Sequence, residues 1–229
     1  MKTAVCFRAV PHRLPKTGEL RDRCGPQQYL AKEETAADFG ARLYTWATRL
    51  GAEQAGTLVV LGDGATWIWN LAQQRWRDAV QILDFYHAAQ YVWSVAHAVF
   101  PDADQAAVWA RKRCRRLVRR GPQGLLRGLR ALQRVGAKLL PTAAAQQAVA
   151  AALGYFGGHA GRMDYPGYRA QGLMIGSGPV EAACKVMVGG RLKGAGKRWT
   201  QLGADAVLAV RALVLGRRFD DLLAFARVT

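Results

Sequence analysis

Two short apolar runs on either side of a helix-forming stretch constrain the fold more than any other feature of the sequence. Thr57–Leu61, which reads TLVVL, and Val80–Leu83, which reads VQIL, have the β-branched content of buried strands. Ala65–Arg77, between them, reads as a short helix. Two strands joined through a helix over so short a distance form a βαβ unit, in which the strands are parallel neighbours. The sequence therefore predicts an α/β fold.

Two aspartates stand where these two predicted strands end. Asp63, which has a glycine on each side, follows the first strand, and Asp84 follows the second. Functional groups gather at the carboxyl ends of parallel strands, and neighbouring strands lie about 4.8 Å apart. Carboxylates so close repel each other unless a proton or a metal ion lies between them, and hard oxygen ligands suit Mg²⁺ or Mn²⁺. The sequence therefore predicts a candidate metal site.

Each candidate residue also has a structural interpretation, which remains open. Asp63 can close a turn, and Asp84 can cap the helix that begins FYHAAQYVW. Glu181, in GSGPVEAACK, falls in the first turn of a predicted helix, where a carboxylate interacts favourably with the helix dipole and can close a capping box. His87, one turn after Asp84, can orient that aspartate or contact phosphate, or can simply pack within its helix.

The remaining elements are predicted to be mostly helical. Thr3–Val10 reads as a strand, Pro11–Pro26 as a broken polar loop or a wide hairpin connection, and Gly154–Gly172 as irregular because it is rich in glycine and aromatic residues. Thr142 can cap an alanine-rich helix that runs to Leu153. The other predicted helices cover residues 33–50, a segment after Asp84 that Pro101 breaks, 106–120, a leucine-rich segment from Leu125 that Pro141 stops, 179–188 and 204–215.

Charge points to the class of partner. The chain has a formal net charge of +17, and the segment from Gln105 to Met163 contains twelve basic residues and no acidic one. Most of these residues are arginine, which suits phosphate, so the charge favours a polyanion such as nucleic acid. A solvated helix face, or a genome that prefers arginine codons, is the alternative explanation.

Other totals exclude several classes of protein. No apolar run approaches the roughly 18 residues of a membrane span, and the first ten residues do not read as a signal peptide. The four cysteines form no CxxC pair, so neither a disulfide framework nor a zinc site is predicted. We expect a cytoplasmic protein with reduced thiols and no membrane partner.

Four stretches of the chain carry a resemblance to a known family. They read VVLGDGATWIWNLA, ILDFYHAAQYVW, MDYPGYRAQGLMIGSGPVEAACK and RLKGAGKRWTQLGADAVLAVRALVL. Together and in this order, over most of residues 33–218, they resemble bacterial insertion-sequence transposases of the DDE, ribonuclease-H-like kind, in a branch with a helical insertion before the glutamate. The resemblance implies a ribonuclease-H-like α/β core with few strands, a large all-α insertion and a mostly helical chain.

The resemblance also implies roles for individual residues. Asp63 matches the aspartate of a DGA motif, Asp84 and His87 match DxxH, and Glu181 matches the glutamate of GSGxxE. The three carboxylates would hold two divalent ions, Mg²⁺ or Mn²⁺, which activate water and then a DNA 3′-hydroxyl for attack on phosphodiesters. The implied partners are the ends of the insertion sequence, the target DNA and further copies of the chain in a homo-oligomer.

Two basic clusters are candidate DNA contacts. The first lies in the predicted insertion, and the second is interleaved with glycine and suits a strand or hairpin end held by phosphate contacts and stacking. Plain surface charge is the alternative for the second cluster. The candidate residues are Arg111, Lys112, Arg115 and Arg119 in the first cluster, and Lys185, Arg191, Lys193, Lys197, Arg198 and Trp199 in the second.

The chain departs from the family at its start. Relatives carry an earlier aspartate on the first core strand, whereas this chain begins at the strand that follows, and Asp22 and Asp38 match nothing in the motif. We therefore expect an N-terminally truncated transposase region that lacks its first strand and first carboxylate, with a separate N-terminal part as a further partner. The expected divisions are a partial core at 1–95, the basic insertion at 96–172 and a helical return to the core at 173–229.

Three functions remain open on these grounds. The first is a transposase catalytic region, incomplete by itself, for DNA cleavage and strand transfer. The second is a non-catalytic, basic DNA-binding remnant of a transposase, whose binding would not depend on Asp63. The third is a general Mg²⁺-dependent nuclease that cuts DNA without needing terminal repeats.

Overall fold

The computed structural model of the chain describes residues 1–15, 18, 20–136, 140, 142–193 and 195–221. Over these residues the protein is mixed α/β and mostly helical, with two two-stranded sheets. It forms two compact units, a continuous unit (Val59–Ser177) and a split unit (Met1–Leu58 with Gly178–Thr229). The divisions at 95/96 and 172/173 stay a prediction. None of the helices in these residues combines the length and apolarity needed to cross a membrane.

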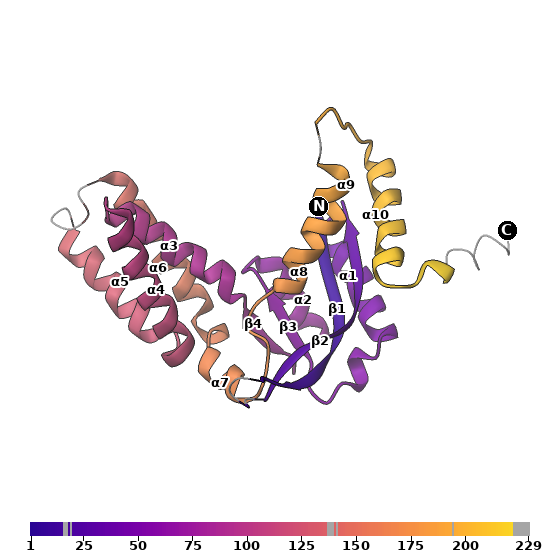
Figure 1. Cartoon of the computed structure of the whole chain (residues 1–229), viewed down its shortest axis with the longest axis horizontal. Helices are drawn as coiled ribbons and strands as arrows, with labels where there is room; N and C mark the ends of the chain where they lie inside the picture. The colour runs from indigo at the N-terminus through magenta and orange to yellow at the C-terminus, as the bar shows by residue number, and fades with distance from the viewer. Residues whose placement is uncertain (16–17, 19, 137–139, 141, 194, 222–229) are drawn as a thin grey trace. The chain divides into compact units, whose positions relative to one another are not determined.

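The continuous unit opens with the predicted βαβ motif. It consists of β3 (Val59–Gly62), α2 (Thr66–Arg75) and β4 (Val80–Leu83). β3 and β4 pair in parallel, with Val59 opposite Val80 and Gly62 opposite Leu83, and lie side by side in Figure 1. The prediction of two adjacent parallel strands is therefore confirmed.

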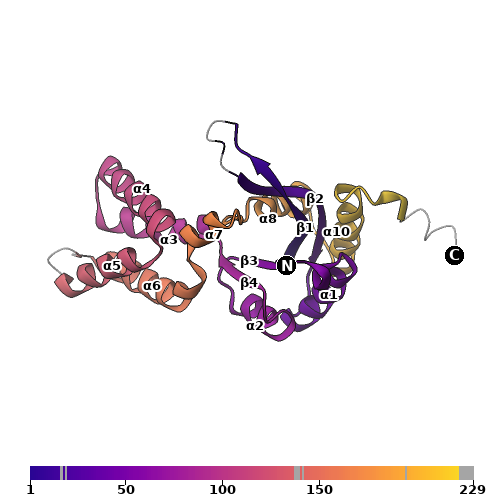
Figure 2. The same ribbon diagram turned by 90° about the horizontal axis from the view of Figure 1, so that it is seen from below.

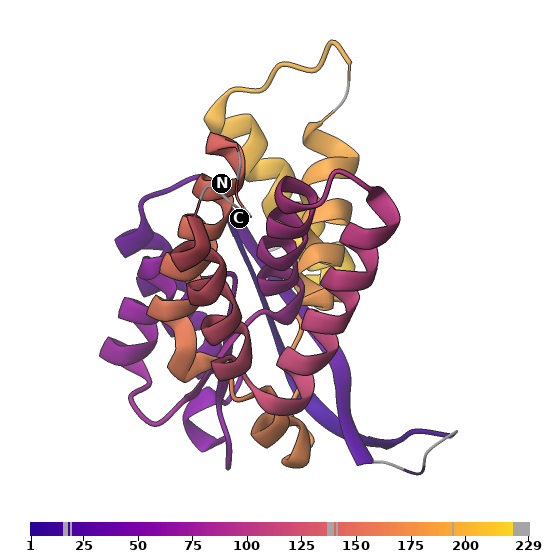
Figure 3. The same ribbon diagram turned by 90° about the vertical axis from the view of Figure 1, so that its left-hand side faces the viewer.

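Helices make up most of the rest of the continuous unit among the residues that the structure describes. It contains α3 (Phe85–Val99), α4 (Ala103–Arg120), α5 (Gln123–Val135), α6 (Ala143–His159), a 3₁₀ turn η3 (Ala160–Arg162) and α7 (Tyr165–Ala170). α3 packs against α4 and α6, and α5 packs against α4 and α6, as Figures 2 and 3 show from two sides. Small and branched side chains let these helices approach closely. The buried core includes Ala106, Leu117, Leu129, Val149 and Phe156.

The predicted break at Pro101 and the predicted cap at Thr142 are confirmed. α4 begins three residues before the predicted start, and Asp102 caps it by accepting a hydrogen bond from the Gln105 amide at 2.8 Å. Thr142 caps α6 by accepting from the Ala145 amide at 3.1 Å, as predicted. The predicted stop at Pro141 lies outside the described residues.

The prediction of an irregular segment at Gly154–Gly172 is wrong. α6 continues through Gly154 to His159, and η3 and α7 cover much of the remainder. Glycine weakens an isolated helix by about 1 kcal/mol relative to alanine, but burial of the opposite face overrides this local preference. Phe156 of α6 and Tyr165 of α7 are both fully buried. Tertiary packing therefore outweighs the glycine content.

The split unit begins with a long antiparallel hairpin, where the sequence predicted a shorter strand and a broken segment. β1 (Lys2–Arg13) pairs with β2 (Leu20–Lys32). Pro11 lies within β1 and pairs with Asp22, and Pro26 lies at a bulge, since the register shifts between Phe7 and Ala9. Proline is tolerated at sheet edges and bulges, and both strands of a two-stranded sheet are edges. The expectation of a hairpin here is therefore confirmed, but the strands extend into Pro11–Pro26, so the expectation of a loop or a wide connection over that whole segment is wrong.

Helices complete the split unit. They are α1 (Ala36–Arg49), the 3₁₀ turn η1 (Ala52–Gln54), α8 (Gly178–Ala183), the π-helix η4 (Cys184–Gly189), α9 (Gly190–Leu192) and α10 (Gln201–Leu215). α10 packs on β2. Ala31, Met187 and Leu208 form the buried cluster that joins β2, η4 and α10.

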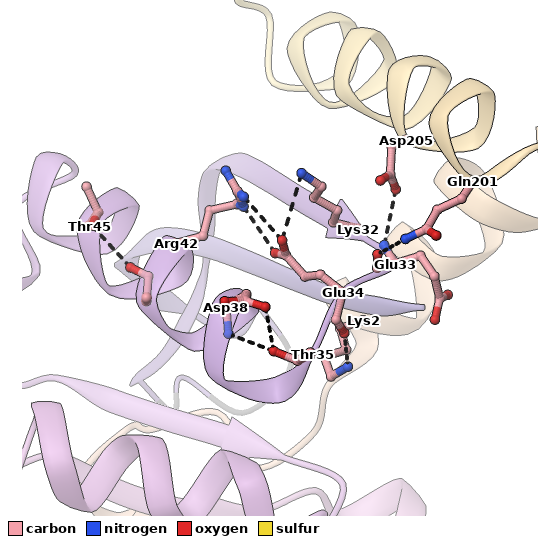
Figure 4. A network of polar contacts seen from close by, with 11 residues as sticks. Lys2, Lys32, Glu33, Glu34, Thr35, Asp38, Arg42, Thr45, Gln201 and Asp205 are labelled. Carbon is pink, nitrogen blue, oxygen red and sulfur yellow. Dashed lines mark hydrogen bonds and ion pairs between the residues drawn. The ribbon is translucent and has the colours of Figure 1, made fainter.

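A polar network holds the end of β2 against α1 and α10 (Figure 4). The Glu34 carboxylate accepts two hydrogen bonds from the Arg42 guanidinium, both at 3.1 Å. The Glu33 amide donates to Asp205 at 3.1 Å, and the Glu33 carbonyl accepts from the Gln201 side chain at 2.8 Å. Both backbone polar groups of Glu33 are thus satisfied by α10, which fixes where the hairpin meets the helices of this unit.

Candidate functional site

Asp63 and Asp84 lie at the same edge of the β3–β4 sheet. They directly follow Gly62 and Leu83, which face each other in the parallel register. The Asp84 amide donates to the Gly62 carbonyl at 2.8 Å, so the strand pairing extends to the first residue after β4. The predicted placement of these two aspartates at neighbouring strand ends is confirmed.

Asp84 is a buried carboxylate with a structural role. Its side chain is 3% exposed. One carboxylate oxygen accepts from the Tyr86 amide at 2.8 Å, which caps α3, and the other accepts from the Ser177 hydroxyl. The helix-cap interpretation is therefore confirmed. Each carboxylate oxygen has two lone-pair positions, so capping leaves acceptor capacity for a further ligand.

Asp63 is exposed and also closes a turn. Its Oδ1 accepts from the Ala65 amide at 2.9 Å, so the turn interpretation is confirmed. Its carbonyl accepts from the Tyr155 hydroxyl of α6 at 3.0 Å. These two hydrogen bonds fix the backbone just after β3, while the Asp63 carboxylate remains accessible to solvent.

A cluster of aromatic rings surrounds this edge. Tyr155 stacks on Tyr91 of α3 with ring centroids 3.9 Å apart. His87 lies 6.0 Å from each of these two rings, so the predicted site histidine belongs to the cluster. Burial raises the pKa of Tyr155, and the nearby Tyr91, Asp63 and Asp84 raise it further. The hydroxyl therefore stays protonated and able to donate to the carbonyl of Asp63.

Gly64 leaves the space that Tyr155 occupies. Its φ is +107°, and a Cβ placed there would lie 2.9 Å from Cε2 of Tyr155 and 3.2 Å from Nε2 of His159. Glycine lets a neighbouring group approach the backbone closely, because it has no Cβ. At Gly64 the groups that approach are two side chains of α6.

His159 faces Tyr155 and Trp69 beside this turn. Its ring centroid is 5.0 Å from that of Tyr155 and 6.1 Å from that of Trp69. Its buried Nδ1 has no hydrogen-bond partner among the described residues. Burial lowers the pKa of His159, and the positive charge of Arg162 lowers it further. The imidazole is therefore held in its neutral form near Asp63.

Tyrosines of α7 hold the carboxyl end of β4. The Tyr165 hydroxyl donates to the Leu83 carbonyl at 3.0 Å, and the Tyr168 hydroxyl donates to the Gln81 carbonyl at 3.2 Å. Sequence reasoning missed these residues and Tyr155, because it treated their segment as irregular. A signal was available, since Tyr155 and His159 are four residues apart and share a helix face once α6 is extended.

Glu181, the third predicted carboxylate, belongs to the split unit. It is exposed in the first turn of α8, where a carboxylate interacts favourably with the helix dipole. Over the described ranges, no three His, Cys, Asp or Glu side chains gather closely enough to hold a metal ion. Of the three predicted carboxylates, Asp63 and Asp84 lie at neighbouring strand ends in the continuous unit.

The candidate DNA-binding residues are accessible. α4 presents four of them in the continuous unit, and six more follow α8 in the split unit. The exposed candidates are Arg111, Lys112, Arg115, Arg119, Lys185, Arg191, Lys193, Lys197, Arg198 and Trp199.

Arg113, another arginine of α4, lies over the ring of Trp109, 5.1 Å from the ring centroid. Burial and the positive charge of Arg116 lower the pKa of its guanidinium.

Comparison with known proteins found no relative of the chain. Neither a protein-family model, nor a curated protein, nor a solved structure matches the chain. The function is therefore inferred from the side chains at the β3–β4 edge, from the basic helices and from the motifs of the sequence.

Proposed function

We propose that the chain is the catalytic region of a DDE-type insertion-sequence transposase with a ribonuclease-H-like core. The observation that carries this proposal is the pair of aspartates, Asp63 and Asp84, at the ends of two adjacent parallel strands. A carboxylate pair at neighbouring strand ends suits Mg²⁺-dependent phosphodiester chemistry, because ligands bind at the carboxyl ends of strands and carboxylate oxygens are ligands for Mg²⁺. The third carboxylate, Glu181, is assigned by its GSGxxE context alone.

Asp63 and Asp84 would hold Mg²⁺ or Mn²⁺ in the continuous unit. A bound divalent ion supplies an activated nucleophile and stabilises charge on the phosphate. The chain's own contribution is to fix the two carboxylates: the Tyr155 hydroxyl holds the Asp63 backbone, and Ser177 holds the Asp84 side chain. His87, in the same aromatic cluster, is the proposed contact for a phosphate oxygen.

The basic helices support DNA as the substrate. The segment 105–163 contains no acidic residue, and most of its arginines are exposed on α4 and α5. Cations without neighbouring carboxylates release counterions from a polyanion on binding, which makes binding strong and salt-dependent. In a functional complex we expect element ends and target DNA to be bound by more than one copy of the chain.

The proposal is tested by replacing the carboxylates. Asp63→Asn and Asp84→Asn should each lower Mg²⁺-dependent cleavage and strand transfer on DNA from the element's ends by at least about 100-fold. Replacing a residue that only hydrogen-bonds to a metal ligand already lowers metal affinity or activity by about 10–100-fold. Mn²⁺ binding, followed by electron paramagnetic resonance, should weaken in parallel. Asp78→Asn is the matched control, because Asp78 is an exposed aspartate of the same unit.

A second candidate is a DNA-binding protein without catalysis. Both aspartates have a structural role that needs no metal ion, and this favours the second candidate. Each accepts a hydrogen bond from a backbone amide. In that case all three variants would bind DNA alike, and the wild-type chain would show no metal binding and no cleavage even when the expected separate N-terminal part is supplied. Cleavage of DNA that lacks element ends, at an equal rate, would instead indicate a general nuclease.

A further inference from the structure

A basic cavity that is open to solvent lies in the continuous unit where α4, α7 and the start of α3 meet. Its volume is about 290 Å³. Three arginines line it: Arg115 and Arg119, one turn apart on α4, and Arg169 in the last turn of α7. α4 and α7 pack directly against each other, so the three guanidinium groups come from two elements that a long stretch of sequence separates.

The lining suits a phosphate group with an apolar portion beside it. No acidic residue is among the described residues that line the cavity, and its other walls are Phe85, Val118 and Cys114. Guanidinium groups match phosphate oxygens in pairs of parallel hydrogen bonds. A sugar can lie against the apolar walls while its phosphate contacts the arginines.

The cavity is tied to the carboxyl end of β4. Phe85, which forms one wall, directly follows Asp84, and its amide donates to the Ile175 carbonyl at 2.8 Å. Its ring meets that of Tyr165 edge-on, at 5.8 Å between centroids, and the Tyr165 hydroxyl donates to the Leu83 carbonyl. A group bound in the cavity is therefore held at a defined place beside the strand that positions Asp84.

We propose that this cavity binds one phosphodiester of a DNA backbone, and that Arg169 completes the site formed by Arg115 and Arg119. The site holds the DNA in register with Asp84 rather than reading its bases, because phosphate contacts position and base contacts specify. Since DNA is the ligand, the inference rests on the proposed function.

The first test is the salt dependence of DNA binding by the full chain. Fluorescence anisotropy with a labelled duplex gives the slope of log K against log salt concentration, which flattens by about 0.9 for each phosphate that the protein no longer neutralises. Arg169→Gln should flatten the slope by about that amount. Arg119→Gln, on the exposed side of the cavity, should do the same and serves if Arg169→Gln unfolds.

The matched control is Arg77→Gln. Arg77 is an exposed arginine of the same unit that does not line the cavity, so this variant removes the same charge at a different place. Its slope should stay close to that of the wild type. If Arg77→Gln and Arg169→Gln change the slope equally, the effect is one of total charge and the proposed site is wrong.

The second test uses Cys114 as a reporter of the cavity. Burial raises the pKa of this thiol to about 11, so its alkylation is slow and sensitive to access. Inorganic phosphate should slow alkylation of Cys114, read by mass spectrometry, and should leave the exposed Cys184 unaffected. This protection should be lost in Arg169→Gln. Equal alkylation of Cys114 with and without phosphate would overturn the proposal.

The outcomes separate this inference from the proposed function. If Arg169→Gln flattens the slope but the wild-type chain never cleaves DNA, even with the expected N-terminal part supplied, the phosphate site stands and the enzymatic proposal fails. If cleavage depends on Asp63 while Arg169→Gln binds DNA as Arg77→Gln does, the site is wrong and the enzyme stands. Protection of Cys114 by phosphate without any change in DNA binding would make the ligand a free anion and overturn the assignment to DNA.

Discussion

The surroundings of His159 oppose its charged form. Burial and the nearby Arg162 lower its pKa from the ordinary 6.5. In the unfolded chain the imidazole has that ordinary pKa, so as the pH falls below about 6.5 the unfolded state binds a proton before the folded state does. Protonation then favours unfolding, and this loss of stability ends only below the lowered pKa of the folded state.

A substitution isolates this contribution. Between about pH 7 and about pH 5 the melting temperature of His159→Gln should fall less than that of the wild type, because the substituted side chain does not titrate. Thermal unfolding followed by circular dichroism at each pH measures the difference. His97→Gln changes an exposed histidine of the same unit and is the matched control. Identical pH profiles for wild type and His159→Gln would contradict this role of His159.

At the scale of an element, the β1–β2 hairpin depends on a bulge. Arg8 of β1 stands opposite two residues of β2, Gly25 and Pro26, because the register shifts between Phe7 and Ala9. A Cβ on Gly25 would lie 2.7 Å from the Arg8 carbonyl oxygen, a backbone atom that cannot turn away. The bulge therefore requires glycine for space.

Gly25→Ala should destabilise the protein by roughly 1–3 kcal/mol, the usual cost of overpacking a fixed site. Urea unfolding measures the change in the free energy of unfolding. Gly56→Ala is the control in the same unit, since a Cβ at Gly56 meets nothing within 4 Å. That substitution should be neutral or stabilise by up to about 1 kcal/mol, because it restricts the unfolded chain. A Gly25→Ala variant as stable as Gly56→Ala would show that the hairpin can shift.

At the scale of the whole molecule, the larger core is confined to one stretch of chain. Every residue of that core, from β3 through α7, lies within the continuous unit. The stretch is of ordinary domain length, and a domain with its own core can fold alone.

A fragment of residues 59–177 should therefore unfold cooperatively by itself. Calorimetry or urea unfolding of the fragment measures this, with coincident transitions in circular dichroism and fluorescence as the criterion. A shorter fragment, 59–135, is the control, because it lacks α6 and its buried Val149, Ala152 and Phe156. A gradual transition in 59–177, with exposed apolar surface, would mean that the stretch needs the rest of the chain.

Local sequence patterns were sufficient to predict the positions of some of the site residues. The β-branched runs, the short helix between them and the obligatory crossover of a βαβ unit predicted that Asp63 and Asp84 would follow adjacent parallel strands. The cap at Thr142 was also readable from its neighbours. These features depend on residues close together in sequence, or on a connection rule with few exceptions. Glu181 was placed in the first turn of a helix, which is correct, but its role as a ligand stays a prediction.

The sequence by itself determined the strand-end position of the two aspartates and the cationic character of the helical block, because both follow from local spacing and composition. Only the tertiary structure decided that Tyr155 and His159 of α6 press against Gly64, and that Arg169 of α7 joins Arg115 and Arg119 of α4. These groups meet through the packing of α6 and α7, whose local glycine content argued against a helix, on their neighbours in the continuous unit. Burial of an apolar face is a sum over distant residues, and no short window of sequence contains it.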